Sequence, residues 1–175
     1  IGGGAAGFFA AITCAENYPD VQVTIIEQNK DVLNKVKISG GGRCNVTHAC
    51  FDPKELVTFY PRGKKELLGP FHKFQPGDTF DWFEKRGVEL KIEEDNRVFP
   101  VSDQSATIVD ALTNNAKAAN VKVWNNTKIQ SITQNTSGNW SLKTSTGQNI
   151  FANILVLATG SSPAAWQMLN EYHEI

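Results

Sequence analysis

Three glycines near the start of the chain, Gly2, Gly4 and Gly7, constrain its fold more than any other feature. They have the spacing Gly-x-Gly-x-x-Gly, and a helix-compatible stretch follows them to about Asn17. In such a turn the first glycine permits the tight bend, the second lets a ligand approach, and the third lets helix and strand pack closely. A β-branched run from Val21 to Ile26 then predicts a strand. The order turn, helix, strand is most of a βαβ unit and predicts an α/β fold with a parallel sheet.

Two helices are expected to have an apolar face. In the first, the residues at helical spacing are Ala6, Phe9, Ala10 and Thr13. In the second, Ser102 is the expected N-cap, Asp103 suits the positive helix end, and one helical face is marked by Ser105, Ile108, Val109, Leu112, Ala116 and Ala119. Only Ile1 precedes Gly2, although such a turn normally follows a buried strand, so we expect further sequence upstream.

The rest of the chain divides into a helical excursion and a strand-rich part. Between about residues 52 and 100, prolines interrupt three short helical stretches (53–59, 64–71 and 77–86), and a strand is expected at 88–92. After Asn120, strand patterns at 121–124, 127–133, 140–144 and 150–157 are separated by turn residues. These predict a three-stranded antiparallel meander that leads into a buried strand.

An acidic residue and a small-residue turn extend the glycine motif into a candidate ligand site. Glu27 lies 20 residues after Gly7, at the end of the next strand, where an acidic side chain binds ribose hydroxyls in dinucleotide folds. The helix N-terminus at Ala5 and Ala6 favours phosphate groups. The turn Ala158-Thr159-Gly160 closes an apolar run and suits a ligand close to the backbone. The alternatives are an ordinary glycine turn and a buried strand that ends in a turn.

A second glycine cluster is the most unusual segment. It contains Ser39, Gly40, Gly41, Gly42, Arg43, Cys44 and Asn45. Three consecutive glycines are entropically costly inside a regular element, so we expect a loop. Its backbone N–H groups and the arginine suit an anionic or flat ligand. The alternative is a mobile surface loop, in which Cys44 and Val46 would be poorly placed.

Four segments together resemble one family, the aminoacetone oxidase-like, BaiN-type flavoproteins of the glutathione-reductase-like FAD fold. They are IGGGAAG at 1–7, KISGGGRCNVTH at 37–48, RVFPVSDQSATIVDAL at 97–112 and LATG at 157–160. Two places depart from the family pattern. Asn96 replaces a glycine that is usual before Arg97, and ATGSSP lacks a second glycine common after Ala-Thr-Gly.

The resemblance implies a Rossmann-like FAD-binding domain with non-covalent FAD. The ADP half would lie on Gly2, Gly4, Gly7 and Glu27, and Ala158, Thr159 and Gly160 would close over the cofactor. The loop Ser39–Asn45 would wrap the pyrophosphate and approach the flavin, with Lys35 at the family's basic position ahead of it. Ile129 would contact adenine through its backbone.

The family's proteins continue past the length of this chain, with an inserted domain and a final stretch that completes the flavin site. Residues 1–175 are therefore expected to be an FAD-binding fragment whose partner is the remainder of the same polypeptide, and which binds FAD weakly alone. The implied function is FAD-dependent oxidation or reduction of a small organic substrate, with NAD(P)H or oxygen as the second reactant. The alternatives are an NAD(P)-binding dehydrogenase and a flavin or nucleotide sensor without turnover.

Composition and patterning argue against several other classes. The 17 basic and 18 acidic residues nearly cancel, which disfavours a nucleic-acid or anionic membrane surface as partner. The longest apolar run, Ile154–Ala158, is far shorter than the roughly 20 residues of a membrane span. Three cysteines make a disulfide framework improbable and favour the cytoplasm. The histidines have no metal-ligand spacing, and no general acid or base is assignable.

The spacing of two cysteines raises a further alternative. Cys44 and Cys50 follow a glycine-rich stretch, as the redox cysteines of disulfide reductases do. Their spacing is C-x5-C rather than the C-x4-C of those enzymes. A dithiol mechanism is therefore the less favoured interpretation.

Overall fold

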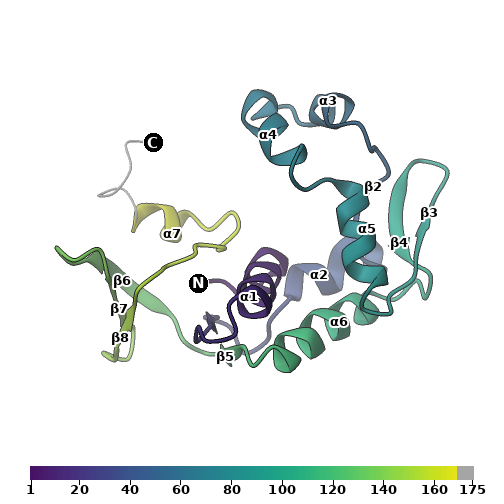
Figure 1. The fold of residues 1–175 in the computed structure, drawn as a ribbon. Helices are drawn as coiled ribbons and strands as arrows, with labels where there is room; N and C mark the ends of the chain where they lie inside the picture. Colours follow the sequence, from purple (N-terminus) through teal and green to yellow (C-terminus); the bar gives the residue numbers. More distant parts are fainter. Residues whose placement is uncertain (169–175) are drawn as a thin grey trace. The chain divides into compact units, whose positions relative to one another are not determined.

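The computed structural model describes residues 1–168, which form helices and short strands (Figure 1). The chain divides into two compact units. The first contains Ile1–Asn34 and the residues from Leu112 onward, and the second contains Lys35–Ala111. Within the described residues, no helix is long and apolar enough to cross a membrane.

A parallel pair of strands forms the centre of the first unit. Strand β1 (Thr24–Ile26) pairs in parallel with β5 (Lys122–Trp124), with Ile25 opposite Val123. The strand is shorter than the predicted stretch from Val21 to Ile26. It begins at Thr24, and Val21 ahead of it is half exposed. This parallel pairing confirms the Rossmann-like α/β class.

Ile1 adds a further step to this parallel arrangement. Its backbone nitrogen donates to the Val156 carbonyl at 2.7 Å, and its carbonyl accepts from the Ala158 nitrogen at 2.8 Å. Bonds from one residue to two residues on either side of a facing position are the parallel ladder pattern. On its other side, the nitrogen of Gly2 donates to the Ile26 carbonyl at 2.9 Å. Ile1 therefore lies between β1 and the segment 156–158.

Helix α1 (Ala5–Asn17) buries a different face from the one that the sequence predicted. Its buried residues are Gly7, Phe8, Ala11, Ile12 and Ala15, whereas Ala6 and Thr13 are exposed. Both sets follow helical spacing, so periodicity alone does not distinguish them. The direction in which the chain enters the helix from the glycine turn decides which face meets the sheet.

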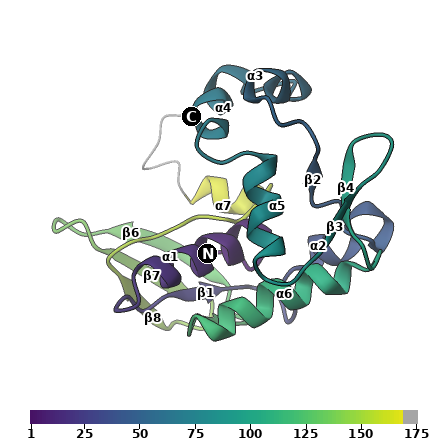
Figure 2. The same ribbon diagram turned by 45° about the vertical axis from the view of Figure 1, so that its right-hand side comes forward.

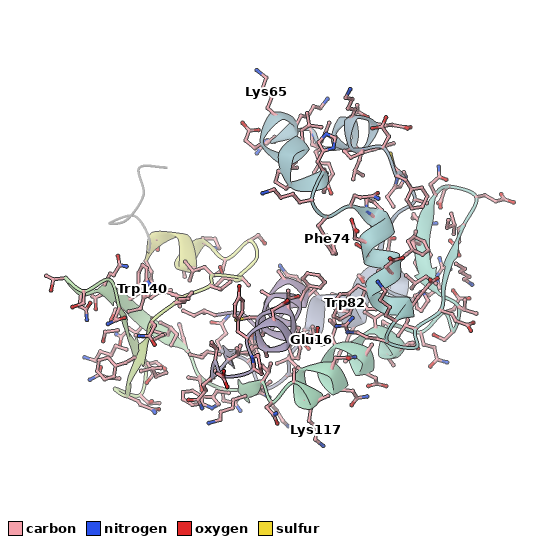
Figure 3. All side chains as sticks on the ribbon, viewed as in Figure 1. Glu16, Lys65, Phe74, Trp82, Lys117 and Trp140 are labelled. Carbon is pink, nitrogen blue, oxygen red and sulfur yellow. The ribbon has the colours of Figure 1, made fainter. Side chains whose placement is uncertain are left out.

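A three-stranded antiparallel meander is present in the first unit, but its third strand comes from the 150–157 pattern, whereas the 121–124 pattern pairs in parallel with β1. Strands β6 (Ile129–Gln134), β7 (Trp140–Thr144) and β8 (Asn149–Ala152) pair antiparallel in that order, and they lie side by side in Figures 1 and 2. Ile129, Ile132 and Leu142 form a buried cluster with Ile26 of β1, and the Trp140 ring, labelled in Figure 3, packs against it. This cluster joins the meander to the parallel strands.

The prediction of a buried strand at 150–157 is wrong. Strand β8 ends at Ala152, and Ile154 is 81% exposed. The apolar run of this segment made burial the natural expectation, but of its side chains Leu155 packs against the buried cluster while Ile154 faces solvent, and the backbone at Val156 and Ala158 hydrogen-bonds Ile1. A short helix, α7 (Pro163–Gln167), follows.

The second unit contains the helical excursion and a small antiparallel sheet. Its helices are α2 (Asn34–Ile38, from Lys35 onward), α3 (Pro53–Leu56), α4 (Lys64–Phe71) and α5 (Pro76–Glu84), with 3-10 turns at Ser39–Gly42 and Val57–Phe59. The proline-bounded helices are therefore confirmed, and α3 and α4 lie together in both ribbon views (Figure 2). The sheet has the order β2 (Thr47–His48), β4 (Arg97–Pro100), β3 (Leu90–Ile92), in which β2 and β4 were not expected.

Helix α6 (Ser105–Ala118) runs from the second unit into the first. Its buried residues include Ile108, Leu112 and Ala116, as the sequence predicted. Its start was wrong, because Ser102 and Asp103 lie before the helix. The Ser102 hydroxyl caps only loosely, 3.3 Å from the Gln104 nitrogen, and Asp103 has a left-handed backbone with φ +54°.

Asn96 shows how the chain accommodates the loss of a family glycine. It lies in the β3–β4 turn with φ +64°, and its nitrogen donates to the Glu93 carbonyl at 2.9 Å. Asparagine is one of the few non-glycine residues that adopts this left-handed region readily. The departure from the family pattern is therefore compatible with the same turn.

Replacing Asn96 by valine is expected to lower the free energy of unfolding by about 1–2 kcal/mol, because a β-branched residue is strained at positive φ. Replacing Asn96 by glycine is the matched control and is expected to be neutral or slightly stabilising. Urea unfolding followed by circular dichroism measures both. Equal stability of the two variants would contradict the left-handed turn.

Candidate dinucleotide-binding site

The first two glycines of the motif differ in what the fold requires of them. Gly2 has φ +106°, and a Cβ atom there would lie 2.3 Å from the Ala158 carbonyl oxygen. Gly4 has φ −91° and ψ −174°, and a Cβ atom there would meet nothing within 4 Å. Internal packing therefore requires a glycine at position 2 but not at position 4.

Gly7 is the most tightly enclosed glycine of the motif. A Cβ atom on Gly7 would lie 1.9 Å from the Gly2 carbonyl oxygen, far inside van der Waals contact. The missing side chain lets the first turn of α1 lie directly against the preceding chain. The sequence predicted close packing of helix and strand at the third glycine, and the structure places that close contact at Gly2, directly after Ile1.

The N-terminus of α1 is not neutralised by side chains of its own first turn. Gly4 is the N-cap and supplies no side-chain hydrogen bond, and the first turn contains no acidic residue. Ala5 and Ala6 in that turn are exposed. A helix start with these properties favours an anion, since its N–H groups carry partial positive charge.

Glu27 points toward the glycine turn. Its Oε2 atom accepts a hydrogen bond from the Gly3 nitrogen at 2.8 Å. Its Oε1 atom accepts from the backbone nitrogen of Asn29 at 2.9 Å and from the Asn29 side-chain amide at 2.6 Å. Two donors occupy Oε1 and one occupies Oε2, so Oε2 retains a lone pair for a further donor such as a hydroxyl.

The small-residue turn after the meander also lies at the glycine motif. Ala158 hydrogen-bonds Ile1, and its carbonyl oxygen is the nearest atom to the position of a Cβ on Gly2. Gly160 has φ +61°, which turns the chain after this approach. The first unit therefore brings together Gly2–Gly7, Glu27 and Ala158. Ile129 is buried in the cluster beneath β1.

Lys35 and the second glycine cluster belong to the second unit. Lys35 is exposed on α2. The cluster forms a tight turn rather than an open loop, with positive φ at Gly40, Gly41 and Gly42. The nitrogens of Arg43 and Cys44 donate to the carbonyls of Gly40 and Ser39 at 3.4 and 3.0 Å. These two N–H groups are therefore used inside the turn itself.

The Arg43 side chain has carboxylate partners within the second unit. Its Nη1 atom lies 2.5 Å from Glu93 Oε1 and 3.2 Å from Asp103 Oδ1, and Nη2 lies 3.3 Å from Glu93 Oε2. Hydrogen bonding to Glu93 raises the pKa of Arg43. The hydrogen bond from Lys91, and to a smaller extent the one from Arg43, lowers the pKa of Asp103. Both directions favour the charged forms, which is the condition for an ion-pair network.

The two cysteines of the second unit lack the features of reactive thiols. Cys44 and Cys50 are both buried, and neither forms a disulfide. Desolvation is the main cause that raises the pKa of each thiol. A redox-active cysteine normally has a lowered pKa, so these surroundings argue against the dithiol interpretation.

Residues 1–169 match the family described as the HI0933-like protein Rossmann domain. The chain belongs to the HI0933-like family. The match includes every segment on which the resemblance to BaiN-type flavoproteins was based, and it confirms that resemblance.

Two curated relatives match most of this HI0933-like chain. The 3-dehydro-bile acid delta(4,6)-reductase of Clostridium scindens is 29% identical over 160 residues, which are 91% of this chain and 38% of that protein. The ribosomal RNA dihydrouridine synthase of Escherichia coli is 28% identical over 160 residues, with the same shares of the two chains. The chain therefore spans less than half the length of these relatives.

A solved structure supports the fold of the HI0933-like chain. The crystal structure of Thermovibrio ammonificans THI4 has a TM-score of 0.63 and 15% identity, covering 99% of this chain and 61% of that one. At this identity, the likeness concerns the fold alone.

Sequence reasoning missed two contributors to the HI0933-like site. Gly3 donates its backbone N–H to Glu27, and Asn29 holds the other carboxylate oxygen. The signal for Asn29 is local: an asparagine two residues after a strand-ending glutamate is a turn former that bonds nearby groups. Nothing in the spacing distinguishes Gly3 from its neighbours.

Proposed function

We propose that this chain is the ADP-binding and pyrophosphate-binding part of an FAD-dependent oxidoreductase that acts on a small organic substrate. The observation that carries the proposal is the contrast at the glycine turn. Gly2 and Gly7 are explained by internal contacts, whereas Gly4 is not, since a side chain there would extend into open space. A ligand diphosphate in that space gives glycine a reason at position 4.

Glu27 supports a dinucleotide with free ribose hydroxyls. Its carboxylate is oriented by Gly3 and Asn29 and has acceptor capacity left on Oε2. A ribose hydroxyl can donate to this oxygen, whereas a 2′-phosphate would be repelled by the carboxylate charge. FAD meets this requirement, and NADP does not.

The remaining cofactor contacts are proposals that rest on the family. Lys35 and the loop Ser39–Asn45 are proposed to lie toward the pyrophosphate and flavin, the backbone of Ile129 toward adenine, and Ala158–Gly160 over the cofactor. Bound flavin supplies hydride or electron transfer, and the protein's part is to bind and orient it.

The reaction partners are proposed only by class. The Clostridium relative is by name a reductase of a bile acid derivative, which is compatible with a small organic substrate here. NAD(P)H is the proposed reductant, and the remainder of a longer polypeptide is the proposed partner of this chain. The three cysteines are all free, which supports the reducing cytoplasm as the location.

The proposal is tested by identifying the cofactor bound to the full-length protein that contains this chain. We expect it to purify with non-covalent FAD, seen as flavin absorption that heat or acid releases, and to consume NAD(P)H or oxygen when substrate is present. Residues 1–175 alone are expected to bind added FAD more weakly. A colourless protein that binds NAD(H) would favour a dehydrogenase, and bound FAD without turnover would favour a sensor.

A further inference from the structure

The three glycines and the arginine of the second glycine cluster suggest that Arg43 is a cation for a bound anion. Its surroundings in the second unit argue otherwise. Glu93 accepts from both terminal nitrogens of the guanidinium, and Asp103 accepts from Nη1 as well. These bonds use three of the five N–H donors of the guanidinium and place two carboxylates beside it, which weakens its attraction for a further anion.

The same guanidinium also stacks on an aromatic ring. The Arg43 Cζ atom lies 3.9 Å from the centre of the Phe99 ring, and Phe99 is fully buried in β4. Cation–π contact of this kind adds to ion pairing where the cation is partly desolvated. Arg43 is therefore held from one side by carboxylates and from another by a core residue.

Phe99 connects this contact to the glycine cluster. A Cβ atom on Gly40 would lie 2.8 Å from Phe99 Cε1 and 2.7 Å from the Asn45 nitrogen. Gly40 thus lies directly against the ring on which Arg43 stacks. The Val46 nitrogen donates a hydrogen bond to the Val98 carbonyl at 2.8 Å. The turn from Ser39 to Val46 is anchored on β4 at both of its ends.

We infer that Arg43 is a positioning residue, which holds the Ser39–Asn45 turn on β4 in its ligand-ready conformation through Glu93, Asp103 and Phe99, and does not itself bind the cofactor's phosphates. This inference rests on the proposed FAD function for its binding readout. It also gives a role to the third family segment, 97–112, which supplies Phe99 and Asp103 as supports of the turn.

The effect of Glu93→Gln on FAD affinity distinguishes a positioning role of Arg43 from direct phosphate binding. If Arg43 holds the turn, Glu93→Gln weakens FAD binding by the full-length protein about threefold to tenfold, in the same direction as Arg43→Met. The two effects are then less than additive in the double variant, because the changes share the Arg43–Glu93 pair, although Arg43→Met also removes the Asp103 contact and Glu93→Gln also removes a 3.7 Å ion pair with Arg97. Arg43→Lys fails to restore binding, since lysine lacks the planar fork.

A direct phosphate ligand would behave differently and would overturn the inference. Glu93→Gln would then release Arg43 and leave FAD affinity unchanged or higher, and Arg43→Lys would retain much of the binding. Asp81→Asn is the matched control, because it removes an exposed ion pair with Lys85 on α5, 3.5 Å apart, and should change nothing.

A readout without FAD keeps the inference testable by itself. Amide hydrogen exchange of the Arg43 and Cys44 N–H groups in the cofactor-free protein should accelerate in both Arg43→Met and Glu93→Gln, while melting temperature reports any global unfolding. Unchanged exchange in both variants would overturn the inference. If wild-type protein binds no FAD, the proposed function fails, and the exchange result still decides the role of Arg43.

Discussion

Replacing Gly7 by alanine is expected to destabilise the protein by at least about 3 kcal/mol, enough to prevent folding of a domain of ordinary stability. The added Cβ atom would lie 1.9 Å from the Gly2 carbonyl oxygen, and this contact is with backbone rather than with a movable side chain. Relief would require α1 to separate from the turn, exposing Phe8 and Ile12. Soluble expression and urea unfolding of the full-length variant measure the effect.

Gly4→Asp is the matched comparison within the same motif. Gly4 has the extended backbone of an N-cap, and aspartate is a preferred N-cap that also suits the helix dipole. The variant should therefore keep or gain up to about 1 kcal/mol of stability while FAD affinity falls at least about a hundredfold, through bulk and charge repulsion. If Gly7→Ala folds normally, or if Gly4→Asp binds FAD like wild type, this account of the turn is wrong.

The second large effect is expected at Glu27. Glu27→Ala should weaken FAD binding about tenfold to a hundredfold, because a charge-assisted hydrogen bond to the ribose is lost and the Gly3 N–H loses its acceptor. Glu27→Gln keeps the size and one acceptor oxygen, so its loss should be smaller. Isothermal titration with FAD measures both.

The control for Glu27 is another acidic residue without a role in the site. Glu66 lies in the first turn of α4 in the second unit and is exposed, so Glu66→Gln should leave FAD affinity unchanged. Equal FAD affinity of wild type and Glu27→Ala would remove the ribose contact from the proposed function.

The candidate site was largely predictable where its residues belong to one βαβ unit. The Gly-x-Gly-x-x-Gly spacing and a glutamate 20 residues later describe one βαβ unit, whose geometry is the same wherever it occurs. The structure accordingly brings Glu27 to the glycine turn, although its hydrogen bond to the Gly3 nitrogen was not predicted. The roles of these residues in binding cofactor stay predictions.

Errors arose where two arrangements satisfy the same pattern. The α1 stripe containing Phe9 and Thr13 has the same period as the one containing Phe8 and Ile12, and only the latter is buried. The apolar run at 154–157 has the composition of a buried strand, yet Ile154 is exposed. An apolar segment is able to be buried, but its composition does not specify which other part of the chain packs against it.

The sequence by itself determined the α/β class, the βαβ order at the start of the chain and the need for glycine in its turn, because these depend on dihedral freedom and periodicity over a few residues. Only the tertiary structure decided the partners of Arg43. Glu93 and Asp103 lie 50 and 60 residues further along the chain, and no local pattern records a pairing at such separations. Charge balance depends on which groups meet in space, and folding alone brings those groups together.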